Sequence, residues 1–357
     1  MIHIKKIDTS LTNIDKIYLI SDVHIRNLKR HTEYIEVFNR LYKEIETTKT
    51  PNSIIVLGGD IVHAKTDMTP ELVEMVQGFF KKCADLCYTI LITGNHDCNL
   101  NNKNRMDALA PIVNAMGHER LLYLRDSGVY NIGNIHFTVM SVFDKPNEFI
   151  KATEFDAPYK IALHHGAVDT AKTDTGHVLS NKHVQISMFD GYDLTLLGDI
   201  HLPAQYLNVE KTIAYPGSLI QQNYAECIGH GMLVWDVYTK TSKFVEIAND
   251  YGFYTMDIIN GKYTLPENLP NKLRLRLRVT DTTNAEIKEI LAVVKSKYDV
   301  LETPIQKVNT IKHNDRTNIT KINLGDVRDI EFQNHLLSEY LKTNFDTVDE
   351  IIDGVNM

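Results

Sequence analysis

Long apolar runs are missing from this sequence of 357 residues. No segment reaches the roughly 18 consecutive apolar residues that a membrane-spanning helix requires, so we expect no membrane span. Residues 1–6 also lack the apolar core of a signal peptide, and we therefore expect an intracellular protein.

Cysteine is scarce, and an excess of positive charge is absent. None of the 4 cysteines forms a Cys-x-x-Cys pair, and Cys83 and Cys87 lie one helical turn apart, which favours buried thiols in a reducing compartment. The formal net charge of −8 argues against binding nucleic acid through a globally basic surface. It does not exclude a nuclease whose cations are bound metals.

Strands and helices alternate in the first third of the sequence. Apolar runs predict strands at 14–21, 53–57 and 88–93, and helical spacing predicts helices at 32–47, 70–86 and 105–116. We expect Thr69 to cap the second helix and Gly117 to end the third. This order is typical of a parallel sheet that carries its functional residues at the carboxyl ends of the strands.

Shorter strands follow, and they are predicted to be largely antiparallel. A hairpin is expected at 129–143, strands at 160–163 and 194–197, and further short strands between 205 and 247. Two sheets, each faced by helices, would give an α/β (α+β) fold, a four-layer αββα sandwich.

Two smaller regions follow this main domain, which we place at 1–250. Residues 251–310 have a strand–strand–helix pattern of their own and are predicted to form a small α+β capping domain. Residues 311–357 are interpreted as a polar linker and C-terminal helices, which either pack on the body of the protein or dock a partner.

Metal-binding residue types follow five of the predicted strands. They are Asp22 with His24, Asp60, Asn95 with His96, His164, and Asp199 with His201. In extended chain, residues i and i+2 project to the same side, so these side chains can converge at one edge of the sheets. Oxygen and imidazole ligands without thiolates suit Mn, Fe or Mg, and they suit Zn less uniquely. This number of candidate ligands is too large for one ion, and it suits two ions that share one carboxylate.

Each motif has a simpler structural interpretation when it is taken alone. Asp22 could cap the following turn, and residues 94–97 could be an ordinary polar turn. His164 is preferred to its neighbour His165 because it directly follows the predicted strand, and His165 stays as the alternative ligand. The packing of a core does not account for five such motifs in one chain, and together they favour a functional site.

Taken in order, the motifs resemble those of the calcineurin-like metallophosphoesterases. They are Asp-x-His at 22–24, Gly-Asp at 59–60, Gly-Asn-His-Asp at 94–97, a histidine after a strand, and Gly-x-x-His at 198–201. The resemblance covers residues 17–247. Three segments are similar to the SbcD-type nuclease subunit of the double-strand-break repair complex and to phage recombination nucleases: Gly59–Lys65, Phe189–Gln205 and Tyr215–Ser218.

The resemblance implies a role for each motif residue. One divalent ion would be held by Asp22, His24, Asp60 and His201, and the other by Asp60, Asn95, His164 and Asp199. His96, oriented by Asp97, and His63 would be catalytic. The ions implied are Mn2+, with Mg2+ or Fe2+ as alternatives. The family usually has histidine where this chain has Asp199, and a carboxylate there favours harder metals.

The resemblance also implies a function in DNA recombination and repair. It implies a 3′→5′ exonuclease and single-strand endonuclease with DNA as substrate, an SbcC-type coiled-coil ATPase as partner, and a homodimer. Two alternatives stay open: a phosphatase or phosphodiesterase acting on other substrates, and a catalytically weak scaffold subunit for the ATPase. The alternating strand at 272–279 is interpreted as a solvated face, with DNA contact as the alternative.

Overall fold

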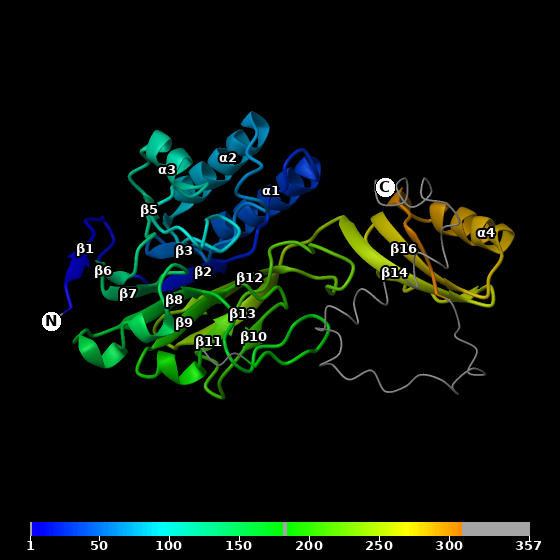
Figure 1. The fold of residues 1–357 in the computed structure, drawn as a ribbon. Coiled ribbons are helices and arrows are strands. Elements are labelled where there is room, and N and C mark those ends of the chain that lie inside the picture. Colours follow the sequence, from blue (N-terminus) through cyan, green and yellow to red (C-terminus); the bar gives the residue numbers. More distant parts are fainter. Residues whose placement is uncertain (1, 181–183, 309–357) are drawn as a thin grey trace, which may run out of the picture. The chain divides into compact units, whose positions relative to one another are not determined.

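A computed structural model describes residues 2–180 and 184–308 (Figure 1). The predicted linker and C-terminal helices at 311–357 lie outside the described residues. Residues up to Val308 belong to one compact unit, which contains three β-sheets. No helix in the described part of the chain combines the length and the apolar character that crossing a membrane would need.

The first sheet is built from the predicted N-terminal strands. Its parallel strands are β2 (Lys16–Ile20), β3 (Ser53–Leu57), β4 (Tyr88–Leu91) and β5 (Leu121–Tyr123). Strands β12 (Gly231–Asp236) and β13 (Thr241–Glu246) extend it antiparallel beside β2. The helices α1 (His31–Thr48), α2 (Pro70–Leu86) and α3 (Ala110–Met116) cover its outer face, as Figure 1 shows.

The ends of these helices follow from their capping residues. The hydroxyl of Thr69 accepts the N–H of Leu72 at the start of α2, and Gly117 ends α3 in the left-handed conformation. Both predicted caps are confirmed. Helix α3 begins at Ala110 rather than at 105, because the Asp107 carboxylate accepts the N–H groups of Leu109 and Ala110 and so fixes the turn before the helix.

The second sheet is mixed. Its order is β1 (Ile4–Lys6), β6 (Gly128–Ile132), β7 (Ile135–Met140), β8 (Lys160–His165), β9 (Leu194–Gly198), β11 (Ile213–Tyr215) and β10 (Gln205–Tyr206). The hairpin β6–β7 is confirmed, and β10, β12 and β13 are antiparallel to their neighbours, as predicted. Strands β7, β8, β9 and β11 are parallel, so the prediction of antiparallel strands is wrong for these four. The segments 141–159 and 166–193 are long enough for the crossovers that parallel neighbours need.

The two sheets pack face to face around an apolar core. Alternate residues of β2 and β8, including Leu19, Ile161 and Leu163, lie in this core, while Tyr18 and Ile20 of β2 pack under the helices. The outer face of the second sheet carries the short 3₁₀ helices η1 (Pro146–Glu148), η2 (Ala152–Glu154) and η3 (Ile186–Phe189). In the described residues the predicted sandwich thus has a helical layer and two sheets, and 3₁₀ turns and loops stand where a second α-helical layer was expected.

The third sheet holds the alternating strand. It comprises β15 (Lys262–Tyr263), β14 (Tyr251–Ile259), β16 (Lys272–Thr280), β17 (Asp299–Glu302) and β18 (Ile305–Lys307), with α4 (Asn284–Lys295) packed against it. The apolar residues of β16 are buried with those of α4, which confirms the half-buried strand. The domain boundaries at 250 and 310 stay predictions.

Candidate metal centre

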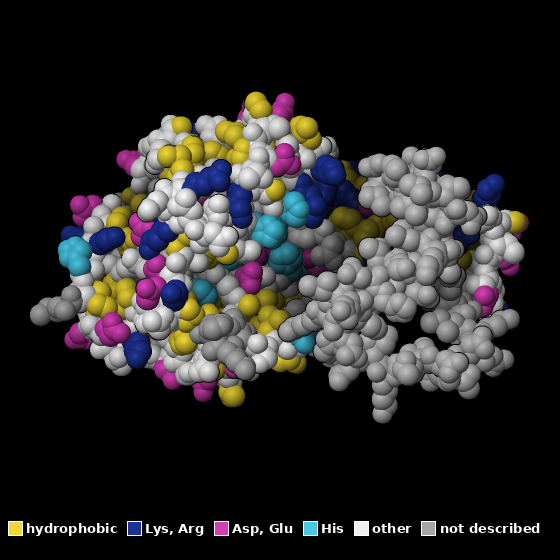
Figure 2. Space-filling view, viewed as in Figure 1, with side chains coloured by type: hydrophobic (Ala, Val, Ile, Leu, Met, Phe, Trp, Pro, Cys, Tyr) yellow, Lys and Arg dark blue, Asp and Glu magenta, His cyan; other side chains and the backbone are white. Residues whose placement is uncertain are grey.

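The carboxyl ends of five parallel strands, β2, β3, β4, β8 and β9, bring polar side chains together at one edge of the two sheets. Backbone hydrogen bonds tie the loops to one another: the N–H of Asp22 donates to Gly59, and that of His24 donates to Asp60. Figure 2 shows the histidine side chains gathered on one face of the molecule, with Lys and Arg side chains beside them. The convergence that the sequence predicted is therefore present.

The backbone reaches this convergence by a route that the sequence did not predict. Asp22, His24, Asp60 and Asp199 have positive φ angles of 53°, 48°, 52° and 102°. Their backbone is in the left-handed region and is not extended. The expectation that these side chains converge because residues i and i+2 of an extended chain project to the same side is therefore wrong. For a residue other than glycine, this conformation costs about 1–3 kcal/mol, and such residues are concentrated at functional sites.

Three side chains form the first group. The Nε2 atoms of His24 and His201 face each other at 3.1 Å. The Asp22 Oδ1 atom lies 3.8 Å from the first of these nitrogens and 3.7 Å from the second. Burial raises the pKa of Asp22 to about 6, because the charged form has no access to water. Two imidazole nitrogens and a buried carboxylate that point at one centre can bind a divalent cation.

Glu226 orients one of these histidines, and sequence analysis missed it. Its Oε1 atom accepts the Nδ1–H of His201 at 2.8 Å, which leaves the Nε2 lone pair for a cation. Burial opposes a charged ring, but the hydrogen bond to Glu226 and the charge of Asp22 raise the pKa of His201 to about 9. A cation bound at Nε2 would replace a proton there. No motif spacing marks Glu226, since the contact joins two separate loops.

Four side chains form the second group, and one of them, Asp60, also faces the first group. The Nε2 atom of His165 lies 3.0 Å from Asn95 Oδ1, 3.4 Å from Asp60 Oδ1 and 3.9 Å from Asp199 Oδ1. The other oxygen of Asp60 lies 3.5 Å from His24 Nε2. Burial disfavours both charges, yet their mutual attraction lowers the pKa of Asp60 and raises that of His165. Asp60 is thus placed to bridge two cations.

The choice of His164 over His165 is corrected by the structure. The ring of His164 packs beside Phe149 and Phe189, with centroid distances of 5.1 and 6.2 Å, and its Nδ1–H donates to the carbonyl of Met140. Strand β8 continues through both histidines, and neighbouring residues of a strand face opposite sides. His165 continues the row of Ile161 and Leu163 toward the site. This alternation was a signal in the sequence that pointed to His165.

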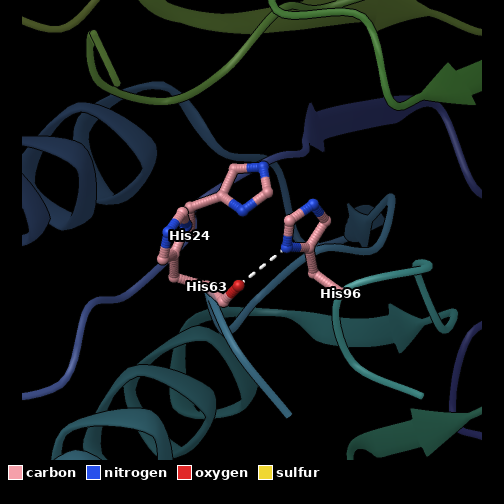
Figure 3. A group of neighbouring side chains, drawn as sticks. All are labelled: His24, His63 and His96. Carbon is pink, nitrogen blue, oxygen red and sulfur yellow. Dashed lines mark hydrogen bonds between the residues drawn. The ribbon is translucent and has the colours of Figure 1, made fainter. Parts of the chain in front are cut away.

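His96 and His63 lie beside the first group. In Figure 3 the ring of His96 faces those of His24 and His63, and its Nδ1 atom is hydrogen-bonded to the His63 carbonyl oxygen at 2.7 Å. The ring centroids of His24 and His96 are 4.7 Å apart. The backbone N–H of His96 donates to Asp60 Oδ1 at 2.8 Å. Because Nδ1 of His96 is bound to this backbone carbonyl, Nε2 lies on the opposite side of the ring and can contact a substrate.

Asp97 does not orient His96, so that expectation is wrong. The two oxygens of this buried carboxylate accept the N–H of Val62 at 3.0 Å and the N–H of Gly94 at 2.9 Å. These bonds join the loop after β3 to the loop after β4. The carbonyl of His63 orients His96 instead, and Asp97 supports the loops that carry both histidines.

The donor set fits divalent metal ions. It consists of carboxylate, amide and imidazole groups without a thiolate, which is a set that hard and borderline cations prefer. His201 and His165 each donate Nδ1–H to an oxygen, of Glu226 and Gly58 respectively, so each presents Nε2 as a ligand atom. Asp22, Asp60 and Asp199 supply negative charge that two divalent cations would offset.

Comparisons with known proteins agree with this chemistry. A family model, "Calcineurin-like phosphoesterase", matches residues 15–203. The chain is 44% identical over 313 residues to "Uncharacterized protein R555" of Acanthamoeba polyphaga mimivirus, which covers 84% of this chain and 23% of that protein. It is 23% identical over 233 residues to "Putative phosphoesterase 244L" of Invertebrate iridescent virus 6, covering 61% of this chain and 75% of the relative.

A solved structure, the NAD nucleotidase of Haemophilus influenzae, aligns with a TM-score of 0.33 and 13% identity. The alignment covers 82% of this chain and 57% of that chain, and it is too distant to carry an argument. The chain spans less than a quarter of the mimivirus relative. The family model, in contrast, matches more than half of the 357 residues and contains all five motifs. This protein belongs to the calcineurin-like phosphoesterase family.

Proposed function

We propose that this phosphoesterase is a two-metal phosphodiesterase that hydrolyses DNA. The observation that carries the proposal is the position of Asp60, whose two oxygens face His24 Nε2 at 3.5 Å and His165 Nε2 at 3.4 Å. A carboxylate shared in this way is the arrangement that two-metal phosphoesterase sites require. When bound, the two cations would neutralise the phosphate and supply a hydroxide for in-line attack.

The protein's own residues position the reacting groups. His24 and His201 on one side of Asp60, and Asn95 and His165 on the other, fix the two ligand groups on separate strand ends. The His63 carbonyl occupies Nδ1 of His96, and no residue described in the structure is hydrogen-bonded to its Nε2, so Nε2 is the atom that can hydrogen-bond to a phosphoryl oxygen or to the leaving oxygen. The ring of His63 lies beside that of His96. Burial, together with the charge of Arg26, lowers the pKa of His63 to about 4.

Finer features of the proposal rest on the resemblance to SbcD-type nucleases. They are Mn2+ as the working ion, 3′→5′ exonuclease and single-strand endonuclease activity, an SbcC-type ATPase partner, and a homodimer. The competing function is hydrolysis of other phosphoesters by the same centre. A weakly active scaffold subunit is the third alternative, and Asp199 in place of the usual histidine is the feature that supports it.

One assay separates these functions. End-labelled single- and double-stranded DNA, bis(p-nitrophenyl) phosphate and p-nitrophenyl phosphate are offered with Mn2+ or Mg2+ to the wild type and to Asp60→Asn. We expect Mn2+-dependent cleavage of DNA and of the diester, and its loss in Asp60→Asn. The matched control is Asp8→Asn, because Asp8 is an exposed carboxylate whose single ion pair among the described residues is with Lys6.

Two outcomes would contradict the proposal. Hydrolysis of the monoester without cleavage of DNA would favour a phosphatase. Failure to bind two metal ions in elemental analysis, together with no hydrolysis of any substrate, would favour the scaffold.

A further inference from the structure

Three guanidinium groups lie together beside the metal centre, at the junction of α1 and β16. Arg30 donates two hydrogen bonds to Glu33, at 2.9 and 2.7 Å, and Arg274 contacts the same carboxylate at 2.9 Å. Arg26 and Arg30 donate to the carbonyl oxygens of Gln222 and Gln221, which are consecutive in the chain. We call Arg26, Arg30 and Arg274 the arginine cluster.

The arginine cluster borders the catalytic histidines. Arg26 follows the ligand position His24 by two residues, and after burial its charge is the largest influence that lowers the pKa of His63. The segment that accepts from Arg26 also supports the centre, because the N–H of Gln222 donates to Glu226 at 2.5 Å and Glu226 orients His201. Figure 2 shows Lys and Arg side chains gathered next to the histidines on this face.

Positive charge in the cluster exceeds what the surrounding carboxylates offset. Arg30 and Arg274 share the carboxylate of Glu33, and no carboxylate of the described residues is paired with Arg26. The next carboxylate, Glu226, accepts from His201, Gln222 and Asn223. A guanidinium N–H of each arginine is buried without an acceptor among the described residues: Nε of Arg26, Nη1 of Arg30 and Nη1 of Arg274. Buried donors are normally paired, so three unpaired donors beside one another indicate an absent anion.

A purely structural role explains part of the cluster. The guanidinium groups of Arg30 and Arg274 lie over the ring of Phe253, at 5.1 and 4.9 Å, and with Glu33 they join β16 to α1. Their side chains are only 6% and 11% exposed. Arg26 takes no part in these contacts, and its hydrogen bond to Gln222 is long, at 3.4 Å. Among the described residues, Arg26 therefore has the weakest partners of the three arginines, and it is the member best placed to donate to a ligand.

We propose that the arginine cluster, through Arg26, binds a second phosphate group of the substrate, next to the phosphate that is cleaved. A guanidinium presents paired donors that match phosphate oxygens, and its charge persists at every physiological pH. A polynucleotide strand presents such a second phosphate next to the one that is cleaved. The inference rests on the proposed function, and it adds that substrates with several phosphates are favoured over an isolated diester.

The test compares a substrate with one phosphate and a substrate with many. The kinetics of cleavage are measured for bis(p-nitrophenyl) phosphate and for a labelled single-stranded oligonucleotide. The enzymes compared are the wild type, Arg26→Gln, Arg26→Lys and Lys29→Gln. We expect Arg26→Gln to lower kcat/KM for the oligonucleotide by about tenfold more than for the diester, mainly through KM. The slope of log KM against log salt concentration should fall by about 0.7, since one phosphate contact is lost.

The other variants control for folding and for general charge effects. Arg26→Lys keeps the charge, so it should retain the salt slope and recover part of the oligonucleotide KM. Lys29→Gln removes a cation from an exposed position of the same loop and should leave both substrates unaffected. Equal losses on both substrates in Arg26→Gln, or an unchanged salt slope, would overturn the inference. Wild-type cleavage of the diester without cleavage of the oligonucleotide would instead refute the DNA function, and the second phosphate site with it.

Discussion

The neighbouring histidines of β8 offer a matched pair of substitutions. His165→Asn removes an imidazole whose Nε2 faces Asn95, Asp60 and Asp199 within 3.9 Å. His164→Asn makes the same chemical change one residue earlier, where the ring packs beside Phe149. Because the two positions are equally buried, a difference in metal content between the variants reports orientation and not general damage.

We expect His165→Asn to affect metal content and activity, and His164→Asn to affect stability. His165→Asn should lose one of two bound ions and reduce hydrolysis by at least about 100-fold, since a bound ion supplies several kcal/mol of transition-state stabilisation. His164→Asn should keep both ions. It should lower the free energy of unfolding by about 1–3 kcal/mol, because the carbonyl of Met140 loses its donor and the apolar packing is weakened.

Elemental analysis of the purified variants and urea unfolding in EDTA measure the two effects separately. Loss of an ion in His164→Asn, with full metal content in His165→Asn, would refute the assignment of the site-facing ring. Equal metal content and equal activity in both variants would show that neither ring contributes a ligand.

Three further substitutions test single roles. His96→Ser should abolish hydrolysis while metal content stays near two ions, and loss of an ion would show that His96 is a ligand. Asp199→His should keep activity and shift the metal preference in competition assays toward Zn2+, because imidazole is the softer ligand; loss of both ions would indicate a structural role. Asp97→Asn should lower the free energy of unfolding by about 1–3 kcal/mol, since an amide has one oxygen for the two N–H donors of Val62 and Gly94. Unchanged urea unfolding would contradict that reasoning.

The gathering of the site could be predicted from the sequence because it depends on connectivity alone. Strands β2, β3 and β4 are parallel neighbours, and so are β8 and β9, so their carboxyl ends lie at common edges. The buried run of β3, which has no polar residue after Ser53, was enough to identify a strand covered on both faces.

Details that depend on one residue of register or on distant contacts could not be fixed in this way. The choice between His164 and His165 turned on whether β8 ended at 163 or at 165, because the alternation of the strand points to His165 only if the strand reaches that residue. The ends of elements are the least certain part of a sequence prediction. Glu226 and the carbonyl of His63 act through contacts between separate loops, and no local pattern encodes such contacts. Asp97 could be recognised as part of a site, but not as the residue that joins its loops.

The structure also explains why the motifs contain glycine next to their metal-binding residues. A Cβ atom on Gly94 would lie 2.1 Å from Asp60 Oδ1, and one on Gly198 would lie 2.3 Å from the Ser21 hydroxyl and 2.4 Å from a backbone oxygen. The loops after neighbouring strands therefore approach closely enough only where a side chain is missing. The ligand positions Asp60 and Asp199 then turn in the left-handed region, which aims their carboxylates across the gap. Glycine for close approach and a strained carboxylate for direction together let separate strand ends meet at one site.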